Sequence, residues 1–312
     1  MRTADTTPPP GPAVLRRRRR RPLEQGVLLL LAAATTISIF VTIGIVFTLV
    51  DEGLPFFTDG NVSLWDFLTG TTWQPVNDAF GVLPLLTASL YIAGIAALVA
   101  IPLGLGSAIY LSEYAPEPVR RTVKPVLELL AGMPTIVLGF FALESVIPVL
   151  QDLGVVKETQ LFSALGAGIV VGILITPLIS SLSEDAMRAV PNAMREGAYG
   201  VGATRRHVST RIVFPAALSG ITAGIVLGLS RAVGETMAVT LAAGTQPNLT
   251  SDPTAPMQTI TAYIVQVSQG EATRGSVTYQ SIFAVGILLF VVTLAINLIA
   301  VRFVRRFRTV YQ

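Results

Sequence analysis

The sequence is poor in the residues that most catalytic and metal sites require. It contains no cysteine, which excludes disulfides, thiolate metal sites and cysteine nucleophiles. A single histidine, His207, cannot form a zinc-binding histidine cluster. The only two lysines, Lys124 and Lys157, each follow a valine, so the Gly-Lys step of a nucleotide-binding P-loop is absent. We therefore expect no catalytic, metal-binding or cofactor-binding residues in this chain.

Charged residues are scarce as well. They make up 13% of the 312 residues, whereas hydrophobic residues make up 52%. Soluble domains usually carry about 25% charged residues, so this composition indicates a membrane protein. A membrane-spanning helix needs about 20 apolar residues. Six runs meet this requirement and predict an all-α protein with six transmembrane helices, at residues 27–50, 83–110, 125–150, 161–182, 216–243 and 280–302.

The distribution of lysine and arginine predicts the orientation. With the N-terminus in the cytoplasm, the four cytoplasmic segments carry seven, three, five and four of these residues, and the outside loops carry two. Cytoplasmic loops are enriched in positive charge, so we place both termini in the cytoplasm of a multi-pass cell-membrane protein. The run Arg16–Arg21 could also be a nucleic-acid-binding tail or the start of a signal peptide. The following apolar run exceeds the 7–15 residues of a signal peptide, so we interpret the arginines as a lipid-facing anchor and expect no nucleic acid partner.

The predicted organisation has four parts. Residues 1–22 form a disordered basic cytoplasmic tail, residues 23–82 the first transmembrane helix with an outside loop, residues 83–303 the transmembrane core, and residues 304–312 a cytoplasmic tail. The longest cytoplasmic loop, 183–215, is amphipathic. We expect a helix, a turn at Gly200–Gly202, and a second helix capped by Thr204. Pro215 would then begin the fifth span.

The spacing within this loop resembles the EAA loop of ABC importer permeases. Glu-Gly-Ala is followed by three residues, a glycine, nine residues, an isoleucine, one residue and Phe-Pro. Two positions depart from the family pattern, with Gly197 in place of alanine and Phe214 in place of leucine. The resemblance implies the type I ABC importer permease fold and a loop that docks on a separate ATPase. The residues it implicates in coupling are Glu196, Gly197, Ala198, Gly202, Ala203, Arg205, Ile212 and Pro215.

The fifth predicted span contains two charged residues, Arg231 and Glu235. At a separation of four residues they would share one face of a helix. An isolated charge at the centre of a span costs about 2.5–3.5 kcal/mol, so such residues usually line a bundle interior or a water-filled path. The planar arginine donors suit an oxyanion. A structural ion pair that locks two helices fits the residues equally well.

A second resemblance concerns the same span. SRAVGETMAV, at 230–239, resembles the fifth-span signature of phosphate ABC permeases, and its GETMAV ending is similar to that of the PstC-type subunit. Stretches at 67–75, 80–86, 102–116 and 132–143 resemble the same family. The resemblance implies that Arg231 guides phosphate while Glu235 sets its orientation and field. It also implies a PstA-type permease partner, two PstB-type ATPase subunits that use ATP and Mg, and an extracytoplasmic PstS-type phosphate-binding protein.

Other interpretations remain open at this point. The chain could be an ABC permease for another oxyanion or polar solute, or the PstA-type partner subunit. A secondary transporter would work without an ATPase and would not be expected to have a loop at EAA spacing. The aromatic outside loop, residues 51–80, could form a surface for the binding protein or an interfacial belt in the lipid bilayer.

Overall fold

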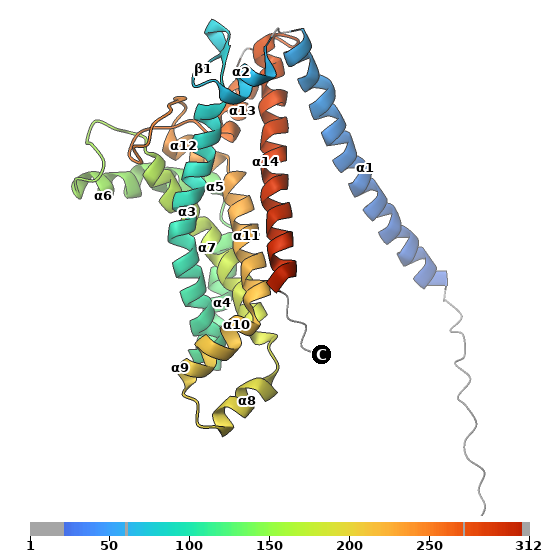
Figure 1. Ribbon diagram of the computed structural model, residues 1–312, viewed down its shortest axis with the longest axis vertical. Coiled ribbons are helices and arrows are strands. Elements are labelled where there is room, and N and C mark those ends of the chain that lie inside the picture. Colours follow the sequence, from blue (N-terminus) through green and yellow to red (C-terminus); the bar gives the residue numbers. More distant parts are fainter. Residues whose placement is uncertain (1–21, 60–61, 271, 308–312) are drawn as a thin grey trace, which may run out of the picture. The chain divides into compact units, whose positions relative to one another are not determined.

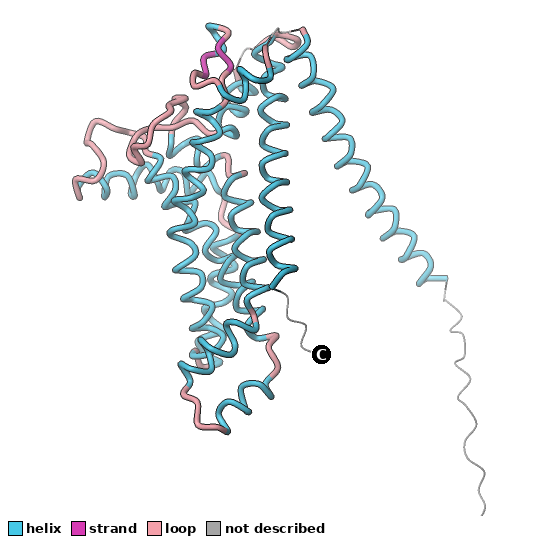
Figure 2. Tube along the Cα trace, viewed as in Figure 1, coloured by secondary structure: helices cyan, strands magenta, loops and turns pink. Residues whose placement is uncertain are grey.

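A computed structural model describes residues 22–59, 62–270 and 272–307, most of which are helical (Figures 1 and 2). Residues 1–21 and 308–312, which include the Arg16–Arg21 run and parts of both predicted tails, lie outside the described residues. The chain divides after Thr48 into two units, and the described part of the first unit is helix α1 up to Thr48. The α-helices are α1 (Pro22–Thr58), α2 (Leu64–Thr69), α3 (Leu83–Ile109), α4 (Glu117–Ala131), α5 (Thr135–Phe141), α6 (Ile147–Asp152), α7 (Ala164–Arg188), α8 (Asn192–Gly200), α9 (Arg205–Val208), α10 (Phe214–Ala216), α11 (Leu218–Val233), α12 (Met237–Ala243), α13 (Ile260–Gln269) and α14 (Val277–Phe307).

Short irregular elements connect several of these helices. Three π-helical segments continue neighbouring helices: η2 (Tyr110–Tyr114), η3 (Ala142–Val146) and η4 (Ser209–Val213). The only strands within the described residues are β1 (Trp73–Gln74) and β2 (Ala79–Phe80), which pair antiparallel around the 3₁₀ turn η1 (Pro75–Asn77). The sheet is therefore a single small hairpin, and the fold is all-α as predicted.

Five helical stretches in the described chain are long and apolar enough to cross a membrane. A sixth is a broken pair, Arg205–Ala216 followed by Leu218–Val233, whose two parts meet at a 70° bend. Counted as one span, this pair brings the number to the six predicted from the sequence. The five unbroken stretches are Gln25–Thr58, Leu83–Tyr114, Thr135–Asp152, Ala164–Arg188 and Val277–Arg302.

The start of the predicted third span and the end of the predicted fourth span are wrong. The third span was expected to begin at residue 125, but helix α4 ends at Ala131 and a new helix starts at Thr135. Pro134 lies between them with extended backbone (ψ 127°), and its missing N–H and its ring favour a break at this point. The fourth span was expected to end at residue 182, but α7 continues to Arg188. Its last turns therefore carry charged residues that were assigned to the loop.

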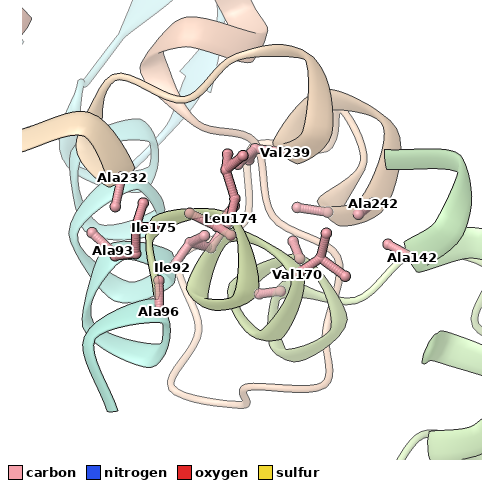
Figure 3. Packing of buried hydrophobic residues seen from close by; sticks show 14 of the residues in the cluster. Ile92, Ala93, Ala96, Ala142, Val170, Leu174, Ile175, Ala232, Val239 and Ala242 are labelled. Atoms are coloured by element: carbon pink, nitrogen blue, oxygen red, sulfur yellow. The ribbon is translucent and has the colours of Figure 1, made fainter. Parts of the chain in front are cut away.

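The core lies where α3 and α7 pack against each other (Figure 3). Alanines of α3, among them Ala96 and Ala100, are fully buried. On α7, Gly168 and Gly172 allow the helix backbones to approach closely: a Cβ added at Gly172 would lie 2.7 Å from that of Val99. Small residues at a helix interface are the usual means of packing inside a membrane, where apolar surface gains nothing by leaving lipid.

The two ends of the bundle differ in character. Helices α8, α9 and α10 lie at one end, and β1, α2 and α13 lie at the opposite end (Figure 1). We call the first of these the basic end, comprising residues 110–124 and 184–217. The ion pair between Arg195 and Glu113 joins both predicted cytoplasmic loops there. This placement confirms that the two loops lie on the same side of the bundle.

The opposite end is held by a cluster of aromatic rings. Trp73 packs edge-to-face on Phe67, Phe80 and Tyr263, with ring centroids 4.9–6.3 Å apart. Phe56 is fully buried in the same cluster. Most of the aromatic residues expected to face lipid or a partner protein are thus internal, and Trp65 is the one that remains largely exposed, at 72%.

Candidate functional site

The loop that resembles the EAA motif folds as the sequence predicts, into two helices joined by a glycine turn. Helix α8 ends at Gly200, and Gly202, two residues later, has a left-handed backbone with φ of +83°. The Ala203 amide donates to the carbonyl of Ala198 at 3.0 Å, and the Gly202 amide donates to the carbonyl of Tyr199 at 2.9 Å. These two bonds form a Schellman motif, which satisfies the last carbonyls of a helix and favours glycine at the left-handed position.

The second helix begins at the predicted cap. The Thr204 hydroxyl accepts a hydrogen bond from the backbone amide of His207 at 3.4 Å. Helix α9 then continues through η4 into α10. Pro215 lies inside this continuous segment and is exposed, so the prediction that it begins the fifth span is wrong. The break occurs two residues later, at Ala217, where the chain turns through 70° into α11.

The predicted coupling residues fall into two groups. Ala198 is buried, and Ala203 and Ile212 are partly buried, in an apolar cluster that also contains Val208 and Val213. The remaining predicted residues are exposed and are available for contact with another chain: Glu196, Gly197, Gly202, Arg205 and Pro215. The loop thus has an apolar side packed on the bundle and an outer side of exposed residues, which include Tyr199 and Val201 as well as the charged Glu196 and Arg205.

Sequence reasoning missed the ionic contacts that attach this loop to the bundle. The Arg195 guanidinium lies 3.0 Å from the Glu113 carboxylate, and it also donates to the carbonyls of Met187 and Val190 at 2.8 and 2.6 Å. Arg195 and Glu113 are 82 residues apart. The only signal in the sequence is the EAA motif itself, since Arg195 immediately precedes Glu196.

A second ionic cluster attaches α4 to the end of α7. The Glu184 side chain is 1% exposed; it accepts a hydrogen bond from Arg120 at 2.6 Å and forms an ion pair with Lys124 at 2.9 Å. Lys124 also reaches Asp185 at 2.7 Å. Burial alone would lower the pKa of the Lys124 ammonium, but the hydrogen bonds and the charges of Asp185 and Glu184 raise this pKa above its usual value. Lys124 therefore stays charged, and the buried carboxylate is compensated.

The predicted pair Arg231–Glu235 does not form on one helix. Helix α11 ends at Val233, and the chain is irregular from Gly234 to Thr236 before α12 begins. Glu235 is buried, at 8% exposure, and its carboxylate accepts from the amide of Ala238 at 3.4 Å. Its carbonyl accepts from the Thr261 hydroxyl at 2.8 Å. Through these two contacts Glu235 stabilises the irregular segment between α11 and α12. The prediction that Arg231 and Glu235 share one face of a single helix is wrong.

Arg231 instead lies on a face of α11 that the described residues of the second unit leave uncovered. Residues at intervals of four along that face, Ala223, Leu227 and Arg231, are exposed. The neighbouring face carries Gly224 and Gly228, which pack closely on α7: a Cβ added at Gly228 would lie 2.8 Å from Ile179. Among the side chains that the structure describes, none forms an ion pair with Arg231.

Comparison with known proteins identifies the family. Residues 100–309 match the family described as "Binding-protein-dependent transport system inner membrane component". The chain is 35% identical over 260 residues to the probable ABC transporter permease protein YqgH of Bacillus subtilis, covering 82% of this chain and 83% of that protein. It is 36% identical over 253 residues to the phosphate transport system permease protein PstC of Mesorhizobium japonicum, covering 76% and 77%.

A solved structure supports the same fold. A chain of a bacterial ABC transporter that imports alginate superposes with a TM-score of 0.64 at 19% identity, covering 93% of this chain and all of that one. The multi-pass helical architecture, the loop at EAA spacing and the sequence relatives all indicate the same family. The chain belongs to the inner-membrane components of binding-protein-dependent ABC transport systems, among the PstC-type permeases.

Proposed function

We propose that this chain is the membrane-spanning permease subunit of an ATP-driven phosphate importer and forms half of its translocation pathway. The observation that carries the proposal is the exposed guanidinium of Arg231 on the uncovered face of α11, in a chain related to PstC permeases. The name of those relatives supports phosphate as the solute.

The position of Arg231 restricts what can lie opposite to it. The next residue, Ala232, is buried in the core cluster between α3 and α7, so Arg231 lies at the depth of that core and away from the helix ends near the basic end. A charge at such a depth is not left facing acyl chains, because the desolvation cost is several kcal/mol. The face Ala223–Leu227–Arg231 therefore borders a water-filled path or another protein chain. A fixed guanidinium on a path attracts a dianion and offers it paired donors.

The uncovered face also indicates that this chain supplies only one wall of the path. A second permease, of the PstA type, supplies the other. Two PstB-type ATPase subunits dock at the basic end, where Glu196 and Arg205 are exposed, and they bind the ATP and Mg that drive the cycle. A PstS-type phosphate-binding protein delivers phosphate at the opposite end. Closure of the ATPase dimer moves the loop and switches access to Arg231 from outside to inside.

The proposal is tested by uptake of radiolabelled phosphate into vesicles that contain the complete complex. Arg231→Ala should reduce uptake to background while the complex still assembles, because the side chain is exposed and no described side chain pairs with it. Arg231→Lys should retain part of the uptake, since the charge remains but the planar pair of donors is lost. Arg121→Ala, which removes an exposed arginine of α4 that lies outside this face, is the matched control and should transport normally.

Two results would contradict the proposal. Normal uptake by assembled Arg231→Ala complex would remove this residue from the pathway. ATP-driven uptake of sulfate or molybdate by the unmodified complex, without uptake of phosphate, would show that the solute is another oxyanion. Copurification of the ATPase in each variant separates a transport defect from an assembly defect.

A further inference from the structure

Arg195 makes more contacts to separate elements than any other charged residue of the basic end that the structure describes. Its guanidinium binds the Glu113 carboxylate through two nitrogens, at 3.0 and 3.3 Å. It binds the carbonyl of Met187, on the last turn of α7, at 2.8 Å, and that of Val190, in the following turn, at 2.6 Å. A further bond, at 3.3 Å, reaches the amide oxygen of Asn192, the first residue of α8.

These contacts lie in a confined environment. The Arg195 side chain is 15% exposed and that of Glu113 is 5% exposed. Glu113 lies in η2, which continues α3 without interruption. One guanidinium therefore joins the loop helix α8 to the ends of both helices of the core pair. The planar guanidinium fixes the direction of each bond, which an apolar contact does not do.

Other contacts at the same end do not have this arrangement. Arg121 pairs with Glu117 on the same helix, and both side chains are largely exposed, at 79% and 58%. The buried Glu184 cluster joins α4 to α7 but includes no residue of α8, α9 or α10. Tyr114 of η2 also contacts the loop, through its hydroxyl to Ser209 at 3.3 Å and through its ring to Arg205, but neither contact includes α7 or α8. The apolar cluster beneath the loop supplies area without fixed direction. Only the Arg195–Glu113 pair, among the described ion pairs, connects the loop to the core helices.

We infer that Arg195 is a positioning residue for energy coupling: it clamps the ATPase-docking loop to the ends of α3 and α7, so that loop and core helices move as one body. The inference rests on the proposed function in one respect, namely that an ATPase docks on residues 192–216. The partner recognised by Arg195 is Glu113 within this chain. The clamp converts displacement of α8 into displacement of the core pair that positions α11.

Two measurements on the complete complex test the clamp. The first is the number of phosphate ions imported per ATP hydrolysed, in reconstituted vesicles. Arg195→Met keeps the length of the side chain and removes every polar contact, and it should lower this ratio at least tenfold. Glu113→Gln keeps an acceptor oxygen but removes the charge, and it should lower the ratio less. Arg121→Met, an exposed arginine at the same end, is the control and should leave the ratio unchanged.

The second measurement reports motion directly. Because the chain has no cysteine, spin labels can be placed at Ala193→Cys on α8 and Leu98→Cys on α3, both exposed, with cysteine-free partner subunits. With Arg195 present, the distance between the labels should stay the same when ATP is added. In Arg195→Met, the distance should shift or its distribution should broaden on ATP binding. A residue that only stabilises the fold would not produce this nucleotide dependence.

The outcomes separate this inference from the proposed function. An unchanged transport ratio together with an ATP-independent label distance in Arg195→Met would overturn the clamp. If Arg195→Met fails to assemble, Glu113→Gln decides: an unchanged ratio in an assembled complex would overturn it equally. If the unmodified complex hydrolyses ATP without importing phosphate, the proposed substrate is wrong, while the label distances still test the clamp.

Discussion

Two glycines of the docking loop, residues 192–216, provide a prediction in which the same substitution changes stability with opposite sign. Gly202 has a left-handed backbone, with φ of +83°, whereas Gly197 lies inside helix α8. A Cβ added at either position would meet no atom within 4 Å. Replacement by alanine therefore changes backbone preference alone, without a steric clash at either site.

The expected magnitudes follow from that difference. Alanine in the left-handed region costs about 1–2 kcal/mol, and the reduced freedom of the unfolded chain offsets about 0.4–1 kcal/mol. Gly202→Ala should therefore destabilise the Schellman turn by about 1 kcal/mol, which is roughly a fivefold rise in local opening. Gly197→Ala, which restores the alanine of the family pattern, should stabilise α8 by up to about 1 kcal/mol and reduce opening by a similar factor.

Hydrogen exchange followed by mass spectrometry measures this opening. The informative amides are those of Gly202 and Ala203, which close the turn with bonds of 2.9 and 3.0 Å. Peptides covering 198–208 should exchange faster in Gly202→Ala and more slowly in Gly197→Ala than in the unmodified chain. Equal or slower exchange in Gly202→Ala would refute the assignment of Gly202 as the left-handed residue that follows α8.

Two further predictions concern the core and the opposite end. Gly172→Ala should destabilise the purified complex by about 1–3 kcal/mol, because the new methyl would lie 2.7 Å from the Val99 Cβ. Gly94→Ala, which has open space around it, should not destabilise it. Equal thermal unfolding midpoints for the two variants would contradict close packing of α3 and α7. Burial raises the pKa of Tyr263 to about 12, and the hydrogen bond between its hydroxyl and Ser281 offsets this rise only in part. Below pH 10 the phenol is protonated in both the folded and the unfolded chain, so its titration does not reduce the free energy of unfolding. As the pH rises from 10 towards 12 the unfolded chain loses the proton first, and the free energy of unfolding should fall. Tyr263→Phe should remove that part of the alkaline loss, and an identical pH profile would show that this phenol does not titrate in the unfolding reaction.

Local signals in the sequence predicted the docking loop well. Gly202 and Thr204 each act within a few residues, through a left-handed turn and a hydroxyl cap, so their structural consequence can be inferred from neighbours alone. The residue pattern also predicted the order of the elements, namely a helix, a glycine turn and a second helix. The division between exposed and buried coupling residues could not be predicted, because it depends on which side of α9 and η4 contacts the apolar cluster.

Predictions that required knowledge of distant contacts failed. Arg231 and Glu235 satisfy the spacing of a helical pair, but Glu235 is held by Ala238 and by Thr261, which is 26 residues further along the chain. A single glycine at 234 does not by itself indicate a break, because helices tolerate isolated glycines. The Arg195–Glu113 pair was missed for the same reason, since 82 residues separate its members.

The bend at Ala217 relates the docking loop to the proposed path. The segment Arg205–Ala216 meets α11 at 70°, so a displacement along that segment is mostly transverse to the axis of α11. A transverse displacement at one end of a rigid helix tilts it about the contacts that hold it, so the tilt is transmitted along its whole length. Arg231 lies fourteen residues beyond Ala217, which corresponds to about 21 Å of helix. A displacement of the loop therefore changes the position of Arg231 only as far as the contacts of α11 allow, and the glycine face of α11 packs on α7. Because the Arg195–Glu113 contact joins the loop to the ends of α3 and α7, we expect α11 to tilt together with this core pair, which carries Arg231 with it.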